Sequence, residues 1–301
     1  MDKYYSPLLF PVRLEDDIIL VLDETELPFE EVFIPVKELN EAIKILSEMR
    51  TRAFGQVLLF FYSAVLFRKK YSLDEIVMRF KEARPTFDFS FLGELLKKET
   101  KEGKDIEEVV NHFISYFDMQ RKNRMKKLAS NLPNPAKILT ICNINGELLY
   151  LYEELKNLEK EVIFYLSETR PYLQGSRLTF WELIRNNIPA KLICDNQAAI
   201  LMQEKKINAV IVGADRCNLK NDIINKIGTY PLARLARYFD IPFYALTQYP
   251  QDLNIDSISI EERPEQEVFM FLSKKISGIR AVYPSFDITK NEFITSTYEI
   301  K

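Results

Sequence analysis

The sequence predicts an α/β protein with a smaller, mainly helical N-terminal domain and a C-terminal domain built around a doubly wound parallel sheet. Beyond residue 135, short apolar runs rich in β-branched residues alternate with segments whose apolar residues recur at helical spacing. Before residue 131, helical spacing dominates and strand-like runs are few. Between the two patterns stands Asn-Leu-Pro-Asn-Pro at residues 131–135, a composition break typical of a domain boundary. We therefore expect domains at residues 1–130 and 131–301.

The N-terminal domain is expected to open with strands and to continue as helices. Short apolar runs at residues 18–22 and 31–34 flank a Leu-Pro turn and predict two strands. The third helical segment stops before Pro85, because the residue that precedes a proline disfavours the helical conformation. The predicted helices cover residues 39–50, 56–69, 73–82, 92–98 and 106–129.

In the C-terminal domain, strands and helices are expected to alternate. The run Ala-Val-Ile-Val at residues 209–212 is apolar at every position, which is typical of a strand buried on both faces of a parallel sheet. Repeated strand–helix order predicts a Rossmann-like sheet with helices on both faces. The predicted strands cover residues 137–141, 161–166, 190–194, 209–212, 242–245 and 280–283, and the predicted helices cover residues 146–158, 176–186, 197–205 and 229–239.

Composition and charge narrow the class of protein. The chain has 301 residues, of which 47% are hydrophobic and 28% charged, as in an ordinary globular protein with a sizeable core. A net charge of −3 gives no electrostatic reason to expect nucleic acid or an anionic membrane as a partner. The basic run at residues 121–127 is interpreted as a solvated helix face. The longest apolar stretch, residues 57–67, is too short to span a bilayer, and no secretory signal opens the chain, so we expect the cytoplasm.

Metal and nucleotide chemistry by the common routes is not indicated. The chain has one histidine, His112, and three widely spaced cysteines, so neither a zinc site nor a disulfide framework is expected. His112 lies in a helical segment without a nucleophile motif, which argues against a Ser-His-Asp site. Neither a Walker A loop nor a Gly-x-Gly-x-x-Gly run occurs, and we expect no cofactor and no metal.

Reactive side chains follow several of the predicted strands. Cys142 follows the first strand of the sheet, Arg170 and Gln174 lie in the loop after the second, and Asp215 follows the fourth. Because parallel strands present their carboxyl ends at one edge of a sheet, these groups are expected to converge there. A thiol and a carboxylate can divide proton transfers between them, while arginines and helix N-termini bind phosphate.

The residue types alone also allow a purely structural interpretation. Free cysteine is among the most buried residue types, and a buried thiol is inert. An aspartate after a strand is often only a cap for the next helix. Cys194 and Cys217 are interpreted as mostly structural.

A resemblance that covers nearly the whole chain favours the catalytic interpretation. The run Glu-Thr-Arg-Pro-Tyr-Leu-Gln-Gly at residues 168–175 is long and specific, and the sequence resembles the methylthioribose-1-phosphate isomerase family. This family shares its fold with ribose-1,5-bisphosphate isomerases and with regulatory subunits of translation initiation factor 2B. The other matching stretches are residues 22–28, 181–183, 213–216, 225–230 and 284–289.

The resemblance implies a reaction and assigns residues to it. It implies an aldose–ketose isomerase that converts 5-methylthioribose 1-phosphate to 5-methylthioribulose 1-phosphate in methionine salvage, and it implies a homodimer. The catalytic thiol falls on Cys142 and the catalytic carboxylate on Asp215. The expected contacts to phosphate and sugar fall on Arg52, Arg84, Gln174, Asn225 and Lys226, with Arg170 as a further cation.

The implied reaction moves a carbonyl from C1 to C2 of the opened sugar. Asp215 suits the group that protonates the ring oxygen and takes the proton of the C2 hydroxyl, which requires a carboxyl whose pKa is raised by burial. If hydrogen passes from C2 to C1 as a proton, Cys142 is placed to carry it. If it passes as a hydride, Cys142 instead shapes a dry pocket.

Departures from the family pattern leave the substrate open. Where the family has Arg-Gly-Ala-Pro-Ala-Ile-Gly, this chain has only Arg-Ala-Phe-Gly at residues 52–55, which offers fewer exposed N–H groups for a phosphate. Ile141 stands before the thiol in place of a histidine, the loop after the thiol is one residue longer, and Asn221 stands where glycine is usual. The alternatives are an isomerase of another sugar phosphate, such as ribose 1,5-bisphosphate, and a non-catalytic binding protein of the initiation-factor type.

Overall fold

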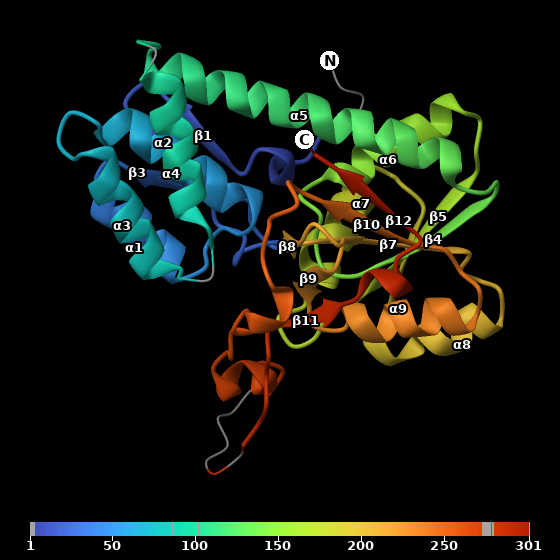
Figure 1. The fold of residues 1–301 in the computed structure, drawn as a ribbon. Helices are drawn as coiled ribbons and strands as arrows, with labels where there is room; N and C mark the ends of the chain where they lie inside the picture. The colour runs from blue at the N-terminus through green and yellow to red at the C-terminus, as the bar shows by residue number, and fades with distance from the viewer. Residues whose placement is uncertain (1–3, 86, 102, 273–277, 279, 301) are drawn as a thin grey trace. The chain divides into compact units, whose positions relative to one another are not determined.

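The computed structural model describes residues 4–85, 87–101, 103–272, 278 and 280–300, and the chain forms two compact units (Figure 1). One unit is Ser6–Met119, and the other joins Met1–Tyr5 to Gln120–Lys301. The units divide inside the long helix α5 (Ile106–Asn131), whereas the composition break at residues 131–135 follows the end of that helix. A break in composition marks where a helix stops, and it carries no information on where packing contacts separate.

The N-terminal unit is mainly helical with a small antiparallel sheet, as predicted. Helix α2 is the centre of this unit, because eleven of its 14 residues are buried and it is apolar on nearly all sides. The third strand begins two residues later than expected, and the first strand was not predicted. The elements are β1 (Val12–Glu15), β2 (Ile18–Leu22), β3 (Phe33–Val36), α1 (Leu39–Ser47), α2 (Phe54–Phe67), α3 (Leu73–Ala83) and α4 (Phe89–Thr100), followed by the first part of α5.

The C-terminal unit contains the predicted parallel sheet, in the strand order β12-β10-β7-β4-β5-β6. Helices α8 and α9 cover one face and α6 and α7 the other, so the sheet is doubly wound (Figure 1). This confirms the predicted fold class. The elements are β4 (Ala136–Thr140), α6 (Glu147–Asn157), β5 (Val162–Ser167), α7 (Trp181–Arg185), β6 (Ala190–Ile193), α8 (Ala198–Gln203), β7 (Ala209–Gly213), α9 (Thr229–Tyr238), β10 (Phe243–Thr247) and β12 (Ser296–Glu299).

The last strand of the sheet is not the one that was predicted. Residues 280–283 form no strand. Tyr283, at the end of this segment, and the two residues after it instead pair with residues 261–263 through backbone hydrogen bonds outside the sheet. The edge position is taken by β12, which pairs with β10 in parallel. The sequence of β12, Ser-Thr-Tyr-Glu, is polar because an edge strand is only partly covered, so it lacks the apolar signature of a central strand.

The C-terminal unit also contains a small three-stranded sheet, which begins after β7 and was not predicted. Its strands are short and antiparallel, in the order β11-β9-β8. They are β8 (Arg216–Cys217), β9 (Ile223–Lys226) and β11 (Phe286–Thr289). Strand β9 carries Asn225 and Lys226, so this small sheet holds two of the predicted site residues directly after the turn that contains Asp215.

The interpretation of residues 121–127 as a solvated helix face is wrong for two of their side chains. Arg121 is 1% and Arg124 5% exposed. Arg124 forms a two-pronged ion pair with the equally buried Glu147 and donates to the Thr247 carbonyl at 2.8 Å. Arg121 donates to the Asn145 carbonyl at 3.3 Å. The helix buries these cations because an anion and backbone carbonyls satisfy them.

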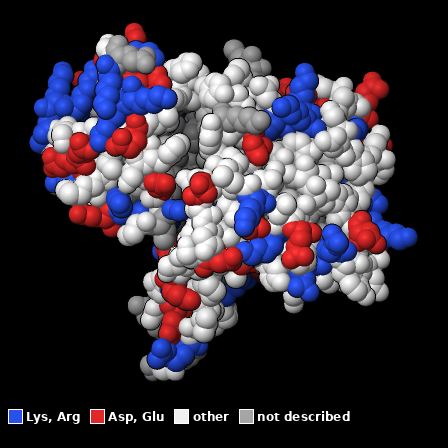
Figure 2. All heavy atoms as spheres, in the orientation of Figure 1, with Lys and Arg blue, Asp and Glu red and all other residues white. Residues whose placement is uncertain are grey.

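Surface charge, the helices and the cysteines bear on the class of protein. In the C-terminal unit, acidic and basic side chains are interspersed on the face that Figure 2 shows. Within the described ranges, no helix is both long and apolar enough to cross a bilayer. Cys217 is buried, Cys194 is exposed and Cys142 is intermediate, and none of the three is in a disulfide.

Candidate active site

Cys142 lies just beyond the carboxyl end of β4 and is held by two threonines. Its N–H donates to the Thr169 hydroxyl oxygen at 2.8 Å, and its carbonyl accepts from the Thr179 hydroxyl at 2.6 Å. Its φ of +66° is left-handed, a conformation that non-glycine residues seldom adopt outside special sites. The thiol therefore sits on a backbone that is fixed on both sides.

The loop that holds Cys142 depends on a close backbone approach at Gly175. This glycine begins a π-helical turn, Gly175–Phe180, of a kind that recurs at functional sites. A Cβ atom at Gly175 would lie 1.8 Å from the Ser167 carbonyl oxygen and 2.9 Å from the Thr169 hydroxyl. Only glycine fits between these two groups, which explains one residue of the predicted motif at 168–175.

Gly175→Ala is expected to destabilise the protein by about 3 kcal/mol, at the upper end of typical overpacking costs, because the clash is with backbone. Urea unfolding of the two proteins measures this. Gly103→Ala is the control, since a Cβ there meets no atom within 4 Å and adds only the cost of a left-handed residue, about 1 kcal/mol. Equal losses in the two variants would contradict the structural role of Gly175.

Asp215 follows β7, and β7 is the neighbour of β4 in the sheet. The Asp215 N–H donates to the Ile224 carbonyl at 2.8 Å, which ties this turn to β9. A Cβ at Gly213 would lie 3.8 Å from the Asn225 side-chain oxygen and 4.0 Å from Ile144. The turn after β7 therefore lies close to the loop after Cys142 and to the Asn225 side chain, at the carboxyl ends of β4 and β7. Asp215 itself is exposed, so the described residues do not supply the burial that a protonated carboxyl requires.

Buried polar atoms at this edge lack protein partners. Gln174 is 5% exposed, and its side-chain oxygen has no hydrogen-bond partner among the described residues. The same holds for the hydroxyls of Thr140 and Thr247, which end β4 and β10. Leaving such a group without a partner costs about 1–3 kcal/mol. Their position at the carboxyl ends of the strands is what a polar ligand at this edge requires.

Asn225 and Lys226 are positioned by β9 and its partner β11. Asn225 is 6% exposed and donates to the Thr229 hydroxyl oxygen at 2.9 Å. The Lys226 ammonium lies 4.7 Å from the centre of the Phe286 ring. Asn225 and Lys226 are consecutive on β9, so their side chains leave the strand on opposite faces. An amide suits sugar hydroxyls and a cation suits phosphate.

The N-terminus of α9 is closed by a residue that sequence reasoning missed. The Asp287 carboxylate accepts from the Gly228 N–H at 2.7 Å and from the Tyr230 N–H at 3.0 Å. A carboxylate of the chain therefore caps the N-terminus of α9 and interacts favourably with the positive end of its dipole. The only signal was that Asp287 lies in the matching stretch at residues 284–289.

Asp287 gives the protein a pH-dependent stability. Burial raises the pKa of Asp287 from 3.8 to about 6, against the lowering effect of the backbone N–H groups that it accepts. The native state keeps this proton up to about pH 6 and the unfolded state releases it near 3.8, so the stabilisation is complete below 3.8 and is lost as pH rises through 6. A pKa rise of this size corresponds to about 3 kcal/mol of unfolding free energy.

In Asp287→Asn this contribution is expected to vanish, so the difference in unfolding free energy between the two proteins changes between pH 4 and about 6. A constant difference across that window would contradict the assignment.

Arg170 contacts another part of the C-terminal unit. Its guanidinium donates to the Val268 carbonyl at 2.6 Å and lies 4.9 Å from the centre of the Phe271 ring. Arg170 thus holds the segment at residues 268–271 against the loop after β5. Its predicted contact with the phosphate stays a prediction.

The predicted phosphate ligands Arg52 and Arg84 belong to the N-terminal unit. Glu24, buried there, accepts from the Thr51 hydroxyl at 2.9 Å and from the Arg52 N–H at 3.0 Å. Burial raises the pKa of Glu24, and the Arg52 charge opposes that rise. Arg84 follows the last residue of α3, and its N–H donates to the Phe80 carbonyl at 3.0 Å. Contact of either arginine with substrate stays a prediction.

The shortened loop at residues 52–55 is anchored by an aromatic side chain. Phe54 is 5% exposed and stacks on Phe117, with ring centres 4.7 Å apart. A Cβ at Gly55 would lie 1.9 Å from the Thr51 hydroxyl oxygen, so this glycine is needed for packing. Phe54 therefore fills space in the core of the N-terminal unit.

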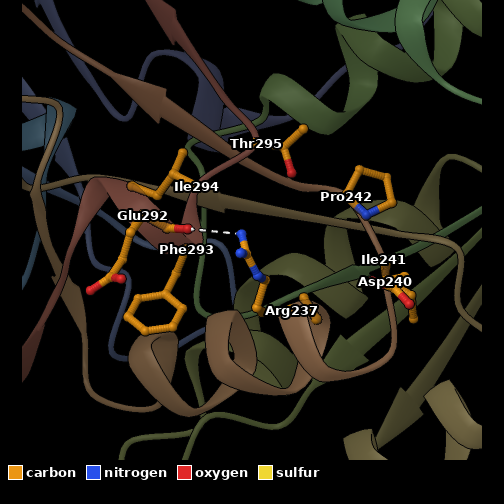
Figure 3. Close-up of a pocket in the computed structure, with 9 residues that line it drawn as sticks. Arg237, Asp240, Ile241, Pro242, Glu292, Phe293, Ile294 and Thr295 are labelled. Atoms are coloured by element: carbon orange, nitrogen blue, oxygen red, sulfur yellow. Dashed lines mark hydrogen bonds between the residues drawn. The ribbon is translucent and has the colours of Figure 1, made fainter.

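A cavity of about 410 Å³ in the C-terminal unit lies at the opposite edge of the sheet (Figure 3). It is bounded by the last turn of α9 and by the residues just before β10 and β12, which are the amino ends of these strands. The Arg237 guanidinium donates to the Glu292 carbonyl at its wall, at 3.3 Å. The cavity is therefore separate from the carboxyl ends of the strands, where Cys142 and Asp215 lie.

In the described part of the chain, no three His, Cys, Asp or Glu residues are grouped to hold a metal ion.

Comparison with known proteins identifies relatives over nearly the whole chain. The sequence model of the Initiation factor 2 subunit family matches residues 35–297. A methylthioribose-1-phosphate isomerase of Aquifex aeolicus is 36% identical over 95% of this chain, which spans 66% of that protein's length. The enzyme of the same name from a Sulfurihydrogenibium species is 35% identical, with 95% of this chain and 90% of the relative covered.

Solved structures with the same fold include both an isomerase and an initiation factor. The 5-methylthioribose 1-phosphate isomerase of Pyrococcus horikoshii OT3 superposes with a TM-score of 0.81 and 27% identity, covering 99% of this chain and 94% of that one. The delta subunit of translation initiation factor eIF-2B from A. fulgidus has a TM-score of 0.76 and 27% identity, covering 96% and 93%. Backbone likeness alone does not separate an isomerase from a factor subunit.

Proposed function

The chain belongs to the Initiation factor 2 subunit family, and we propose that within it the chain is an aldose–ketose isomerase that acts on a phosphorylated pentose. The proposed substrate is 5-methylthioribose 1-phosphate and the proposed product 5-methylthioribulose 1-phosphate, a step of methionine salvage. Support comes from relatives named methylthioribose-1-phosphate isomerase, which are 35–36% identical to this chain. One observation carries the proposal: a thiol and a carboxylate, Cys142 and Asp215, follow two strands that are neighbours in the sheet.

In the proposed reaction, Asp215 transfers protons to and from two oxygens of the sugar, the ring oxygen and the C2 hydroxyl. Its carboxyl donates a proton to the ring oxygen as the bond between C1 and that oxygen breaks, and its carboxylate then takes the proton of the C2 hydroxyl as the C2 carbonyl forms. The group thus ends in the protonation state in which it began. Because Asp215 is exposed, the bound sugar has to supply the dry surroundings that favour the protonated carboxyl at the start.

Cys142 is proposed to act on the carbon-bound hydrogen. In the proton route, the thiolate takes the proton from C2 to give an enediol and returns it to C1. In the hydride route, hydrogen passes directly from C2 to C1, and the thiol excludes water from the path. Both routes balance, because one hydrogen leaves C2 and one arrives at C1.

The remaining predicted contacts divide into hydroxyl ligands and cations. Gln174 and Asn225 are buried amides that suit the sugar hydroxyls. The cations proposed for the phosphate are Arg52, Arg84, Arg170 and Lys226. For Gln174 the support is the side-chain oxygen that has no hydrogen-bond partner among the described residues.

The test is turnover of a defined sugar phosphate. Purified protein is incubated with 5-methylthioribose 1-phosphate, and ¹³C and ³¹P NMR follow the appearance of a ketose 1-phosphate. Formation of the ketose is the expected result. Turnover of ribose 1,5-bisphosphate in its place would keep the reaction class and change the substrate.

The second candidate function is a non-catalytic, initiation-factor-like binding protein. The observation that favours it is the loop at residues 52–55, where Phe54 is committed to core packing and few glycines remain. Binding of a sugar phosphate without turnover of any pentose phosphate would support this second function and contradict the first.

A further inference from the structure

The loop after β5 is held by a carboxylate from the neighbouring strand. Asp195 stands just beyond β6, which pairs with β5 in the sheet. Its carboxylate accepts the Ser167 hydroxyl, the Thr169 N–H at 2.8 Å and the Arg170 N–H at 2.7 Å. One side chain thus satisfies three donors of this loop with charge-assisted hydrogen bonds, which are stronger than neutral ones.

The loop passes this constraint to Cys142 through Thr169. The Thr169 hydroxyl donates to the Ser167 carbonyl at 3.0 Å, which leaves a lone pair of its oxygen for the Cys142 N–H. Thr169 has a φ of +64°, which a β-branched residue rarely adopts without support from its surroundings. The bond from its N–H to Asp195 supplies part of that support.

We propose that Asp195 is a positioning residue for the thiol: it fixes Thr169, and Thr169 fixes the backbone of Cys142. This inference rests on the proposed function, because it assigns Asp195 a role in the same site. Cys142 is left-handed, so loss of the acceptor for its N–H lets the residue relax toward a commoner conformation. Misplacement of a reacting group by about 1 Å can cost about 100-fold in rate.

The test reads the state of Cys142 separately from turnover. Labelling of Cys142 by iodoacetamide is followed by mass spectrometry of its peptide, in the absence of substrate, for Asp195→Asn, Thr169→Val and Thr169→Ser. The first two variants are expected to change the labelling rate by at least about 3-fold and to lower kcat by about 10–100-fold, with KM within about 3-fold of wild type. Thr169→Ser keeps the hydroxyl and is expected to stay near wild type in both.

Asp256→Asn is the matched control, because Asp256 pairs with Lys290 at the surface of the same unit. It is expected to change neither labelling nor kcat. Unchanged Cys142 labelling in folded Asp195→Asn and Thr169→Val proteins would overturn the proposal, as would equal damage in Thr169→Ser and Thr169→Val. If Asp195→Asn does not fold, the Thr169 pair decides. A wild-type protein without turnover would contradict the proposed function, while the labelling result would still decide the role of Asp195.

Discussion

Cys142→Ser is expected to lower kcat by at least about 100-fold, the low end for a general acid–base group. A hydroxyl is much less acidic than a thiol and cannot take a proton from carbon at neutral pH. KM is expected to change little, because the binding contacts are proposed to come from other residues. Turnover of 5-methylthioribose 1-phosphate by NMR measures both quantities.

Cys194→Ser is the control for this experiment, because Cys194 is exposed and lies at the end of β6. It is expected to keep full activity, and equal kcat values in the two variants would move the reaction away from Cys142. Turnover in D₂O then tests the proton route. Deuterium at C1 of the product assigns proton transfer through Cys142, because a proton held on the thiol can exchange with the solvent and a hydride cannot.

Asp215→Asn is expected to lower kcat by at least about 100-fold as well, because the amide cannot donate and accept the protons of the two oxygens. The amide keeps the shape of the side chain, and the backbone bond from residue 215 to Ile224 is unaffected, so the fold is expected to persist. The measurement is again kcat by NMR, with the thermal unfolding midpoint as a check on folding.

Asp240→Asn provides the matched change at the other edge of the sheet. Asp240 lines the cavity at the amino ends of β10 and β12 (Figure 3) and is expected to be dispensable. If Asp240→Asn lost activity and Asp215→Asn kept it, the active site would lie at the amino ends of the strands. That result would contradict its proposed place at the carboxyl ends.

The sequence predicted the central strands and helices because burial on both faces leaves a strong pattern. Strands β4, β5, β7 and β10 are mostly apolar, and all were predicted with small shifts at their ends. Strand β12 was missed because an edge strand tolerates polar residues. Residues 280–283 were mistaken for it because three of the four, residues 281–283, are apolar or aromatic. The strands β8, β9 and β11 are too short to carry a periodic signal.

The grouping of Cys142, Arg170, Gln174 and Asp215 was predicted from their places after parallel strands. The other site residues were assigned only by the family resemblance. The supporting contacts do not follow from local sequence. Asp195 and Asp287 act on segments 25 to 59 residues away in the chain, and nothing in their own neighbourhoods indicates this. Arg124 likewise was placed at the surface because a run of cations usually is, whereas Glu147 and Thr247 receive it in the interior.

The most direct measurement of the central claim is a crystal structure of Cys142→Ser with bound 5-methylthioribose 1-phosphate. We expect C1 and C2 of the sugar to lie at the carboxyl ends of β4 and β7, with residue 142 and Asp215 each within about 3 Å of the atoms on which they are proposed to act. A sugar phosphate bound elsewhere, or hydrophobic side chains filling the space between those two residues, would contradict it.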